Sequence, residues 1–272
     1  MKSKKKLLSG PYLFWATAFI IIPLLIIVYY GFTDNENQFT FANIAKITTP
    51  ENLKALGLAL LLSLISTTIC LLLAYPLAMI LTGLGVNQNS FVVLIFILPM
   101  WMNFLLRTIA WQNLLEKNGV INTLLHTFGL PSMNLINTPA AIILGMVYNF
   151  LPFMVLPIYN VLLKVDKDVL DAAKDLGANG VQSFLRITLP LSVPGIISGI
   201  TMVFVPALTT FVISDLLGGS KILLIGNVIE QEFKQGSNWH VGSGLSLVLM
   251  IFIILSMALI AKYDKEGEGN LF

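Results

Sequence analysis

Six apolar runs of about 20 residues or more constrain this chain more than any other feature. A helix needs about 20 apolar residues to cross the hydrocarbon core of a bilayer. Helices satisfy their backbone polar groups within the segment, whereas an open strand in lipid does not. The runs are residues 12–32, 53–84, 91–115, 139–163, 191–217 and 245–262. The sequence therefore predicts an all-α, polytopic membrane protein with six transmembrane helices.

Composition narrows the class further. Charged residues make up 11% of the chain and hydrophobic residues 56%, which excludes an ordinary soluble domain. The single cysteine, Cys70, lies in an apolar run and cannot form an internal disulfide. His126 and His240 are isolated from other metal-ligand residues. We therefore expect no metal, no cofactor bound by this chain and no nucleic-acid partner.

The placement of lysine and arginine predicts the orientation, because cytoplasmic loops are richer in these bases. With the N-terminus inside, ten bases lie inside and five lie outside. The inner set is Lys2, Lys4, Lys5, Lys6, Lys164, Lys167, Lys174, Arg186, Lys262 and Lys265, and the outer set is Lys46, Lys54, Lys117, Lys221 and Lys234. We expect an N-in, C-in topology, with residues 1–272 forming one domain and residues 165–190 in the cytoplasm.

A polar segment at residues 171–190, DAAKDLGANGVQSFLRITLP, interrupts the apolar pattern. Acidic residues precede Gly177, which permits the left-handed conformation that ends a helix. An apolar stripe at helical spacing follows and consists of Val181, Phe184, Leu185 and Leu189. The pattern predicts two short helices joined at a glycine. Their apolar face fits either a partner surface or a helix packed on its own bundle.

This segment resembles the EAA loop of ABC importer permeases, which in that family docks on a separate ATPase. The matching residues are Asp171, Ala172, Ala173, Gly177, Phe184, Ile187, Leu189 and Pro190. Many family members have Glu where this chain has Asp171. The resemblance implies the type I ABC importer permease (MetI-like) fold and an ATPase-coupling role for these residues. The chain has no Gly-Lys dipeptide and hence no phosphate-binding loop, so we expect ATP and Mg on the partner ATPase and no enzymatic activity here.

A longer resemblance covers nearly the whole chain. It is carried by residues 99–103, PMWMN; Arg107; residues 151–159, LPFMVLPIY; residues 214–219, SDLLGG; and residues 224–229, LIGNVI. These strings are similar to the PotB-type permeases of spermidine/putrescine importers. The resemblance implies a polyamine substrate, a PotC-type second permease, a PotA-type ATPase dimer and a PotD-type extracytoplasmic binding protein. It also implies a bacterial plasma membrane, with lipid around the helices.

Candidate residues for the translocation path are Trp101, Asn103, Arg107, Tyr148 and Asp215. Charges at membrane depth are costly in lipid and are functional candidates by default. At about 1.5 Å per residue, Arg107 and Asp215 lie about 24 Å and about 36 Å from the inner ends of their predicted helices. Asp215 either contacts a cationic substrate or pairs with Arg107. Trp101 suits either cation–π contact or packing, and Asn103 suits a bond between helices.

Three smaller patterns complete the prediction. Residues 119–130 have helical spacing and fit an interfacial helix. Residues 218–242 carry enough apolar residues that part of the segment is expected to fold back among the helices. Gly195 and Gly199 form a small-xxx-small pattern, which predicts close approach of a neighbouring helix.

Other function classes remain open at this point. The same fold serves importers of ferric iron, thiamine or phosphonates. An intramembrane hydrolase would need two acids, Ser with Lys, or HExxH inside the membrane, whereas this chain has only Asp215, near one end of a run. A passive channel would not need a docking loop.

Overall fold

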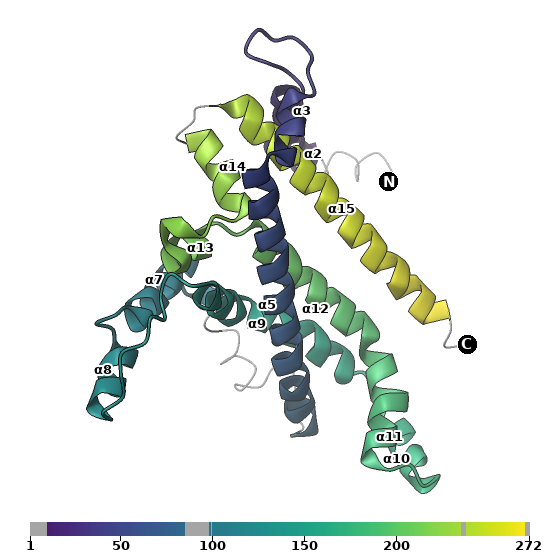
Figure 1. Cartoon of the computed structure of the whole chain (residues 1–272). Coiled ribbons are helices and arrows are strands. Elements are labelled where there is room, and N and C mark those ends of the chain that lie inside the picture. The colour runs from purple at the N-terminus through teal and green to yellow at the C-terminus, as the bar shows by residue number, and fades with distance from the viewer. Residues whose placement is uncertain (1–9, 85–97, 99, 235–237, 270–272) are drawn as a thin grey trace. The chain divides into compact units, whose positions relative to one another are not determined.

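The computed structural model describes residues 10–84, 98, 100–234 and 238–269 (Figure 1). In those ranges the regular secondary structure is helical, apart from one isolated antiparallel bridge between Thr33 and Phe39. The all-α prediction is therefore confirmed. The chain divides into two compact units: Met1–Ala55 with Val228–Ile254, and Leu56–Asn227 with Leu255–Phe272. The single domain over residues 1–272 stays a prediction.

Five helices in the described residues are long and apolar enough to cross a membrane. They are Pro11–Gly31, Pro50–Gly83, Pro139–Leu162, Gly180–Thr209 and Trp239–Ala258. The predicted run at 91–115 lies partly outside the described residues, and its described end is α7 (Phe104–Leu115). The count of six spans and the N-in, C-in orientation stay predictions.

The first unit begins with a span made of α2 (Gly10–Ala16), a π-helical stretch (Thr17–Ile21) and α3 (Ile22–Gly31). The short α4 (Ala42–Ala45), the end of α14 (Ile225–Lys234) and the start of α15 (Trp239–Gly269) complete it. The Asn43 amide closes the turn after α3 by donating to the carbonyls of Gly31 (3.3 Å) and Thr33 (2.8 Å). A Cβ on Gly31 would lie 2.4 Å from the Leu247 side chain, so α3 approaches α15 closely.

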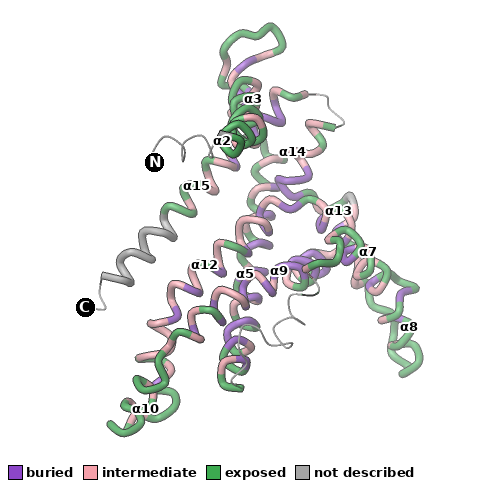
Figure 2. The backbone as a smooth tube through the Cα atoms, turned by 180° about the vertical axis from the view of Figure 1, so that it is seen from behind, coloured by how far each residue is buried: buried purple, intermediate pink, exposed green. Residues whose placement is uncertain are grey.

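The second unit is built on α5 (Pro50–Gly83) from Leu56 onward, α9 (Pro139–Leu162) and α12 (Leu189–Thr209). Buried residues recur along α9, as Figure 2 shows. A Cβ on Gly195 would lie 2.9 Å from the Pro157 carbonyl oxygen, and one on Gly199 would lie 2.6 Å from the Met154 sulfur. The predicted close approach at these glycines is confirmed, with α9 as the neighbouring helix. The predicted interfacial segment contains a helix, α8 (Val120–Thr127).

The predicted helix at 191–217 is wrong at its far end. Helix α12 ends at Thr209, Thr210 is extended (φ −66°, ψ 141°), and a separate helix, α13 (Val212–Gly218), carries Asp215. The break is tolerated because the Phe211 carbonyl accepts a bond from the Asn227 amide (3.1 Å). The distance of about 36 Å for Asp215 along one continuous helix therefore does not hold.

The near end of the same run also differs from the prediction. Helix α11 (Gly180–Ser183), a π-helical turn (Phe184–Thr188) and α12 follow one another without a break. The second short helix of the polar segment is therefore the first turn of a 30-residue helix. The folded-back segment at 218–242 is confirmed in part, because Leu224 and Ile225 at the start of α14 are fully buried.

Candidate functional site

The EAA segment, residues 166–190, forms a helix, a glycine turn and a second helix. Helix α10 (Lys167–Asp175) is capped by Asp166, whose carboxylate accepts a hydrogen bond from the Asp168 amide (3.0 Å). Gly177 has φ of 86°, and its amide donates to the Lys174 carbonyl at 2.8 Å. The predicted left-handed turn at Gly177 is confirmed. Asn179 then caps α11 through a reciprocal pair of bonds with Gln182 (2.8 and 2.9 Å).

The EAA segment presents apolar side chains to its surroundings. Helix α10 contains no buried residue, and most of it is exposed in Figure 2. The apolar patch consists of Val169, Leu176, Val181 and Leu185, of which Leu176 is 90% exposed. Val181 and Leu185 belong to the predicted stripe. Val169 and Leu176 were missed, although Leu176 directly precedes the glycine turn. An exposed apolar patch rimmed by charges is typical of a protein interaction site.

Asp171 lies on the exposed side of α10. Lys174 donates a hydrogen bond to its carboxylate at 2.8 Å, and this lowers the pKa of the Asp171 carboxyl below its ordinary value. A lowered pKa stabilises the fold above the unfolded pKa, and this contribution is lost as the pH falls through the folded pKa. Both side chains are about two-thirds exposed, so solvent screens the pair and the contribution is small. The acid therefore stays charged and accessible at neutral pH.

The remaining EAA residues lie at the base of the segment. The carbonyls of Ala172 and Ala173 accept the bonds that close α10, from the amides of Leu176 (3.1 Å) and Ala178 (2.9 Å). Phe184 turns inward, and its ring packs edge-on against Tyr75 of α5, with centroids 5.6 Å apart. Leu189 and Pro190 form the first turn of α12. The ATPase-coupling role of all these residues stays a prediction.

Asn227 organises a second polar site, at the break between α12 and α13. Its amide nitrogen donates to the Asp215 carboxylate (2.6 Å) and to the Phe211 carbonyl (3.1 Å). Its amide oxygen accepts bonds from the Ser214 hydroxyl (2.6 Å) and the Leu224 amide (3.0 Å). All four hydrogen-bonding positions of the side chain are used. Asn227 thus joins the SDLLGG and LIGNVI strings and holds an exposed Asp215 in place.

Sequence analysis assigned no role to Asn227, although one signal was available. A single amide within an apolar run, directly after Gly226, needs hydrogen-bond partners if it is buried. Gly226 is required by the same geometry, because a Cβ there would lie 2.8 Å from the Thr209 carbonyl oxygen.

Arg107 lies in α7 and Asp215 in α13. Arg107 is 7% exposed, and its Nε and Nη1 atoms make no hydrogen bond with the described part of the chain. The reading of Asp215 as the partner of Arg107 stays a prediction. The reading of Asp215 as a contact for a cation stays open.

The other path candidates are Asn103, Trp101 and Tyr148, and each has its own surroundings. Asn103 caps its own helix, because its side chain accepts bonds from the amides of Leu105 (2.8 Å) and Leu106 (3.3 Å). The predicted bond from Asn103 to another helix is wrong, and the cap interrupts the predicted 91–115 helix. Trp101 is 76% exposed. The Tyr148 ring packs edge-on against Trp111, with centroids 5.3 Å apart.

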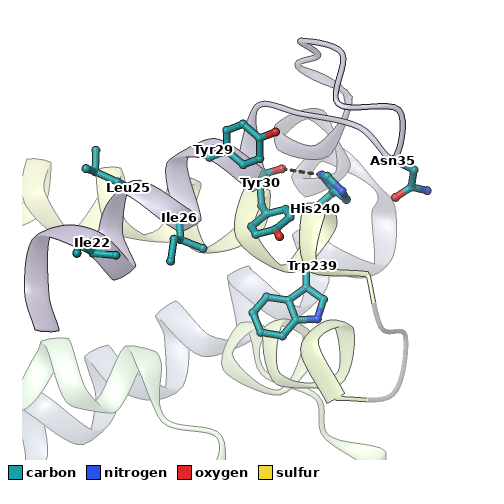
Figure 3. Close-up of a pocket in the computed structure, with 8 residues that line it drawn as sticks. All are labelled: Ile22, Leu25, Ile26, Tyr29, Tyr30, Asn35, Trp239 and His240. Carbon is teal, nitrogen blue, oxygen red and sulfur yellow. Dashed lines mark hydrogen bonds between the residues drawn. The ribbon is translucent and has the colours of Figure 1, made fainter. Parts of the chain in front are cut away.

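A cavity of about 720 Å³ lies in the first unit, between α3 and the start of α15 (Figure 3). Its lining residues are Ile22, Leu25, Ile26, Tyr29, Tyr30, Asn35, Trp239 and His240. The His240 Nδ1 atom lies 3.2 Å from the Tyr30 carbonyl and therefore carries the proton. None of the lining residues is acidic, so the cavity lacks the charge that would attract a cation. Its rings are typical of the aromatic belt at a membrane surface.

Comparison with known proteins places these features in a family. The chain matches the family of binding-protein-dependent transport system inner membrane components over residues 3–264. It is 37% identical over 259 residues to the spermidine/putrescine transport system permease protein PotB of Haemophilus influenzae, which covers 92% of this chain and 91% of that protein. It is also 37% identical over 251 residues to PotB of Escherichia coli K12, which covers 89% of this chain and 91% of that protein.

Solved structures support the fold independently of sequence. A bacterial ABC transporter involved in alginate import superposes with a TM-score of 0.79, covering 98% of this chain and 96% of the other, at 17% identity. A bacterial alginate ABC transporter in complex with a pentasaccharide-bound periplasmic protein gives 0.78 at 16% identity, covering 95% and 93%. At these identities the likeness shows the fold alone. The chain is a multi-pass membrane protein, and it belongs to the family of binding-protein-dependent transport system inner membrane components.

Proposed function

We propose that this chain is a permease subunit of an ATP-driven importer of polyamines, spermidine and putrescine. The observation that carries the proposal is the 37% identity to PotB proteins over about nine-tenths of both chains. The chain forms half of the translocation path and pairs with a PotC-type permease. A PotA-type ATPase dimer binds ATP and Mg, and a PotD-type protein delivers the substrate. Competition among spermidine, putrescine, ferric iron, thiamine and phosphonate for uptake tests the substrate class.

The mechanism follows from the positions of the two polar sites. ATP binding closes the ATPase dimer, and the EAA segment moves with it through its exposed apolar patch and Asp171. The segment continues into α12 through the π-helical turn at Phe184–Thr188, so the movement reaches the membrane at the start of α12. Helix α12 ends at Thr209, where the Asn227 site begins. The path opens outward and closes again after hydrolysis.

The six-helix, N-in, C-in topology is part of the proposal, and labelling of single cysteines tests it. Asp168 and Lys117 are both exposed, and they are predicted to lie on opposite sides of the membrane. In a Cys70→Ser background, an impermeant thiol reagent added to intact cells is expected to modify Lys117→Cys but not Asp168→Cys. In permeabilised cells the reagent should modify both cysteines. Labelling of Asp168→Cys in intact cells would place the EAA segment outside and contradict the proposed topology.

Asp215→Asn tests the cation path. The substitution keeps the size of the side chain and an oxygen that can accept the Asn227 bond, but it removes the charge. We expect uptake to fall about 10-fold or more, because a hydrogen bond to a charged group is worth about 1.5–3 kcal/mol. Uptake of spermidine, which carries more positive charge, should fall more than uptake of putrescine. If Asp215 instead pairs with Arg107, the double change Arg107→Gln with Asp215→Asn should restore uptake relative to either single change. Unchanged uptake of both polyamines would remove Asp215 from the path.

A further inference from the structure

One tyrosine attaches the base of the EAA segment to α5. The Tyr75 hydroxyl lies 2.8 Å from Ser192 Oγ, and both residues are buried. Ser192 donates its own proton to the Leu189 carbonyl at 2.8 Å, so the hydroxyl of Tyr75 is the donor to Ser192. The same ring packs edge-on against Phe184, at 82° between planes. Tyr75 therefore contacts both the π-helical turn and the first turn of α12.

The helix that Tyr75 holds is weakened at this point. Residues Phe184–Thr188 form a π-helical turn, in which the Leu189 amide bonds to the Phe184 carbonyl. Such turns are rare within α-helices and are frequent at functional sites. Pro190 and Pro194 lack the backbone N–H that would continue the helical ladder. The stretch therefore has fewer backbone bonds to resist bending than an ordinary helix has.

A cleft of about 410 Å³ opens next to this contact. It lies between the end of α5, the end of α9 and the EAA segment, and its lining residues are Met79, Thr82, Gly83, Leu162, Leu163, Val165, Lys167, Leu170 and Thr188. Met79 lies one helical turn beyond Tyr75 on α5, and Thr188 lies one turn before Ser192. The two helices are thus joined at Tyr75 and separated one turn further on. The cleft leaves space between the EAA segment and the end of α5.

We propose that Tyr75 is a positioning residue for coupling and serves as the pivot about which the EAA segment moves against α5. The hydroxyl bond to Ser192 fixes the start of α12, while the π-helical turn bends and the cleft narrows. The inference rests on the proposed ATP-driven function. It adds a residue on α5, about 100 positions before the EAA segment, to the coupling machinery.

Tyr75→Phe in the reconstituted complex tests the proposal. Phenylalanine keeps the ring contact with Phe184, and Ser192 keeps its bond to Leu189, so no buried donor is left without a partner. ATPase binding and basal ATP hydrolysis should be unchanged. Stimulation of hydrolysis by loaded binding protein, and polyamine taken up per ATP, should fall about two- to tenfold, the range for one buried hydrogen bond. Ser192→Ala combined with Tyr75→Phe should lose no more than the larger single effect.

Ser66→Ala is the matched control, because Ser66 is buried on the same helix and bonds to Met146 of α9 at 3.3 Å. This variant should couple as the wild type does. Wild-type coupling in Tyr75→Phe, or equal losses in Tyr75→Phe and Ser66→Ala, would overturn the pivot. If polyamine-loaded binding protein fails to stimulate even the wild type, the proposed substrate is wrong. Hydrogen exchange of residues 184–192 then decides the pivot: exchange must be faster in Tyr75→Phe than in Ser66→Ala, and equal rates overturn it.

Discussion

Gly177→Val is expected to abolish stimulated ATP hydrolysis in the assembled importer while the protein still inserts in the membrane. Gly177 has φ of 86°, a region that costs L-residues about 1–2 kcal/mol and β-branched residues more. Nothing lies within 4 Å of the position of a Cβ, so the penalty is one of backbone conformation rather than space. The turn between α10 and α11 should reorganise and displace the apolar patch. Stimulation by loaded binding protein should fall about 10-fold or more.

Gly180→Ala is the control for this prediction. Gly180 lies three residues further on in α11, has no positive φ, and would also place its Cβ in open space. This variant should bind the ATPase, and the ATPase in the assembled importer should hydrolyse ATP at the wild-type rate. Wild-type coupling in Gly177→Val would show that the EAA segment is not the docking site.

Asn227→Ala should be among the most destabilising single substitutions in the second unit. It removes four hydrogen bonds and leaves the buried Leu224 amide without its acceptor. A buried polar group without a partner costs about 1–3 kcal/mol, and the cavity adds to this, so we expect a loss of about 2–4 kcal/mol. The apparent melting temperature of the purified protein in detergent should fall, and uptake should be lost with it.

Asn149→Ala provides the comparison, because both residues are 1% exposed. Asn149 donates only to the Gly145 carbonyl of its own helix (2.9 Å), and its Oδ1 atom has no partner in the described residues. Removing this amide should therefore change the melting temperature much less than removing that of Asn227. Equal losses would mean that burial alone, rather than the Asn227 bonds, stabilises the break after α12.

The predictions that succeeded depend on neighbouring residues in the sequence. Apolar runs predicted the spans because lipid imposes the same length on every helix that crosses it. The turn at Gly177 was predicted because its cause, a glycine after an acidic helical stretch, lies within one turn of the chain. The exposed positions of Val181 and Leu185 followed from helical spacing for the same reason.

The predictions that failed depend on partners distant in the sequence or on a choice between partners. The break after Thr209 is stabilised by the hydrogen bond from the Asn227 side-chain amide to the Phe211 carbonyl, 16 residues earlier. A hydropathy pattern contains no information about such a bond. The Asn103 side chain can bond either to another helix or to the start of its own helix. It bonds to its own helix, because the first amides of a helix have no partner within the helix and lie two and three residues away. Phe184 was predicted to lie on an apolar stripe open to a partner. Its ring instead packs against Tyr75, which lies more than 100 residues earlier in the chain.

The backbone contact between α9 and α12 has a mechanical consequence. At Gly195 and Gly199 α12 contributes no side chain to the interface, so the Pro157 carbonyl and the Val161 and Met154 side chains of α9 contact its backbone directly. Sliding between packed helices usually proceeds by small rotamer adjustments in the side chains between them. Here there is little to adjust, so the pair resists shear and behaves as a single stiff rod over this length. A displacement that reaches Gly195 is therefore passed on to Gly199 without being absorbed in the interface.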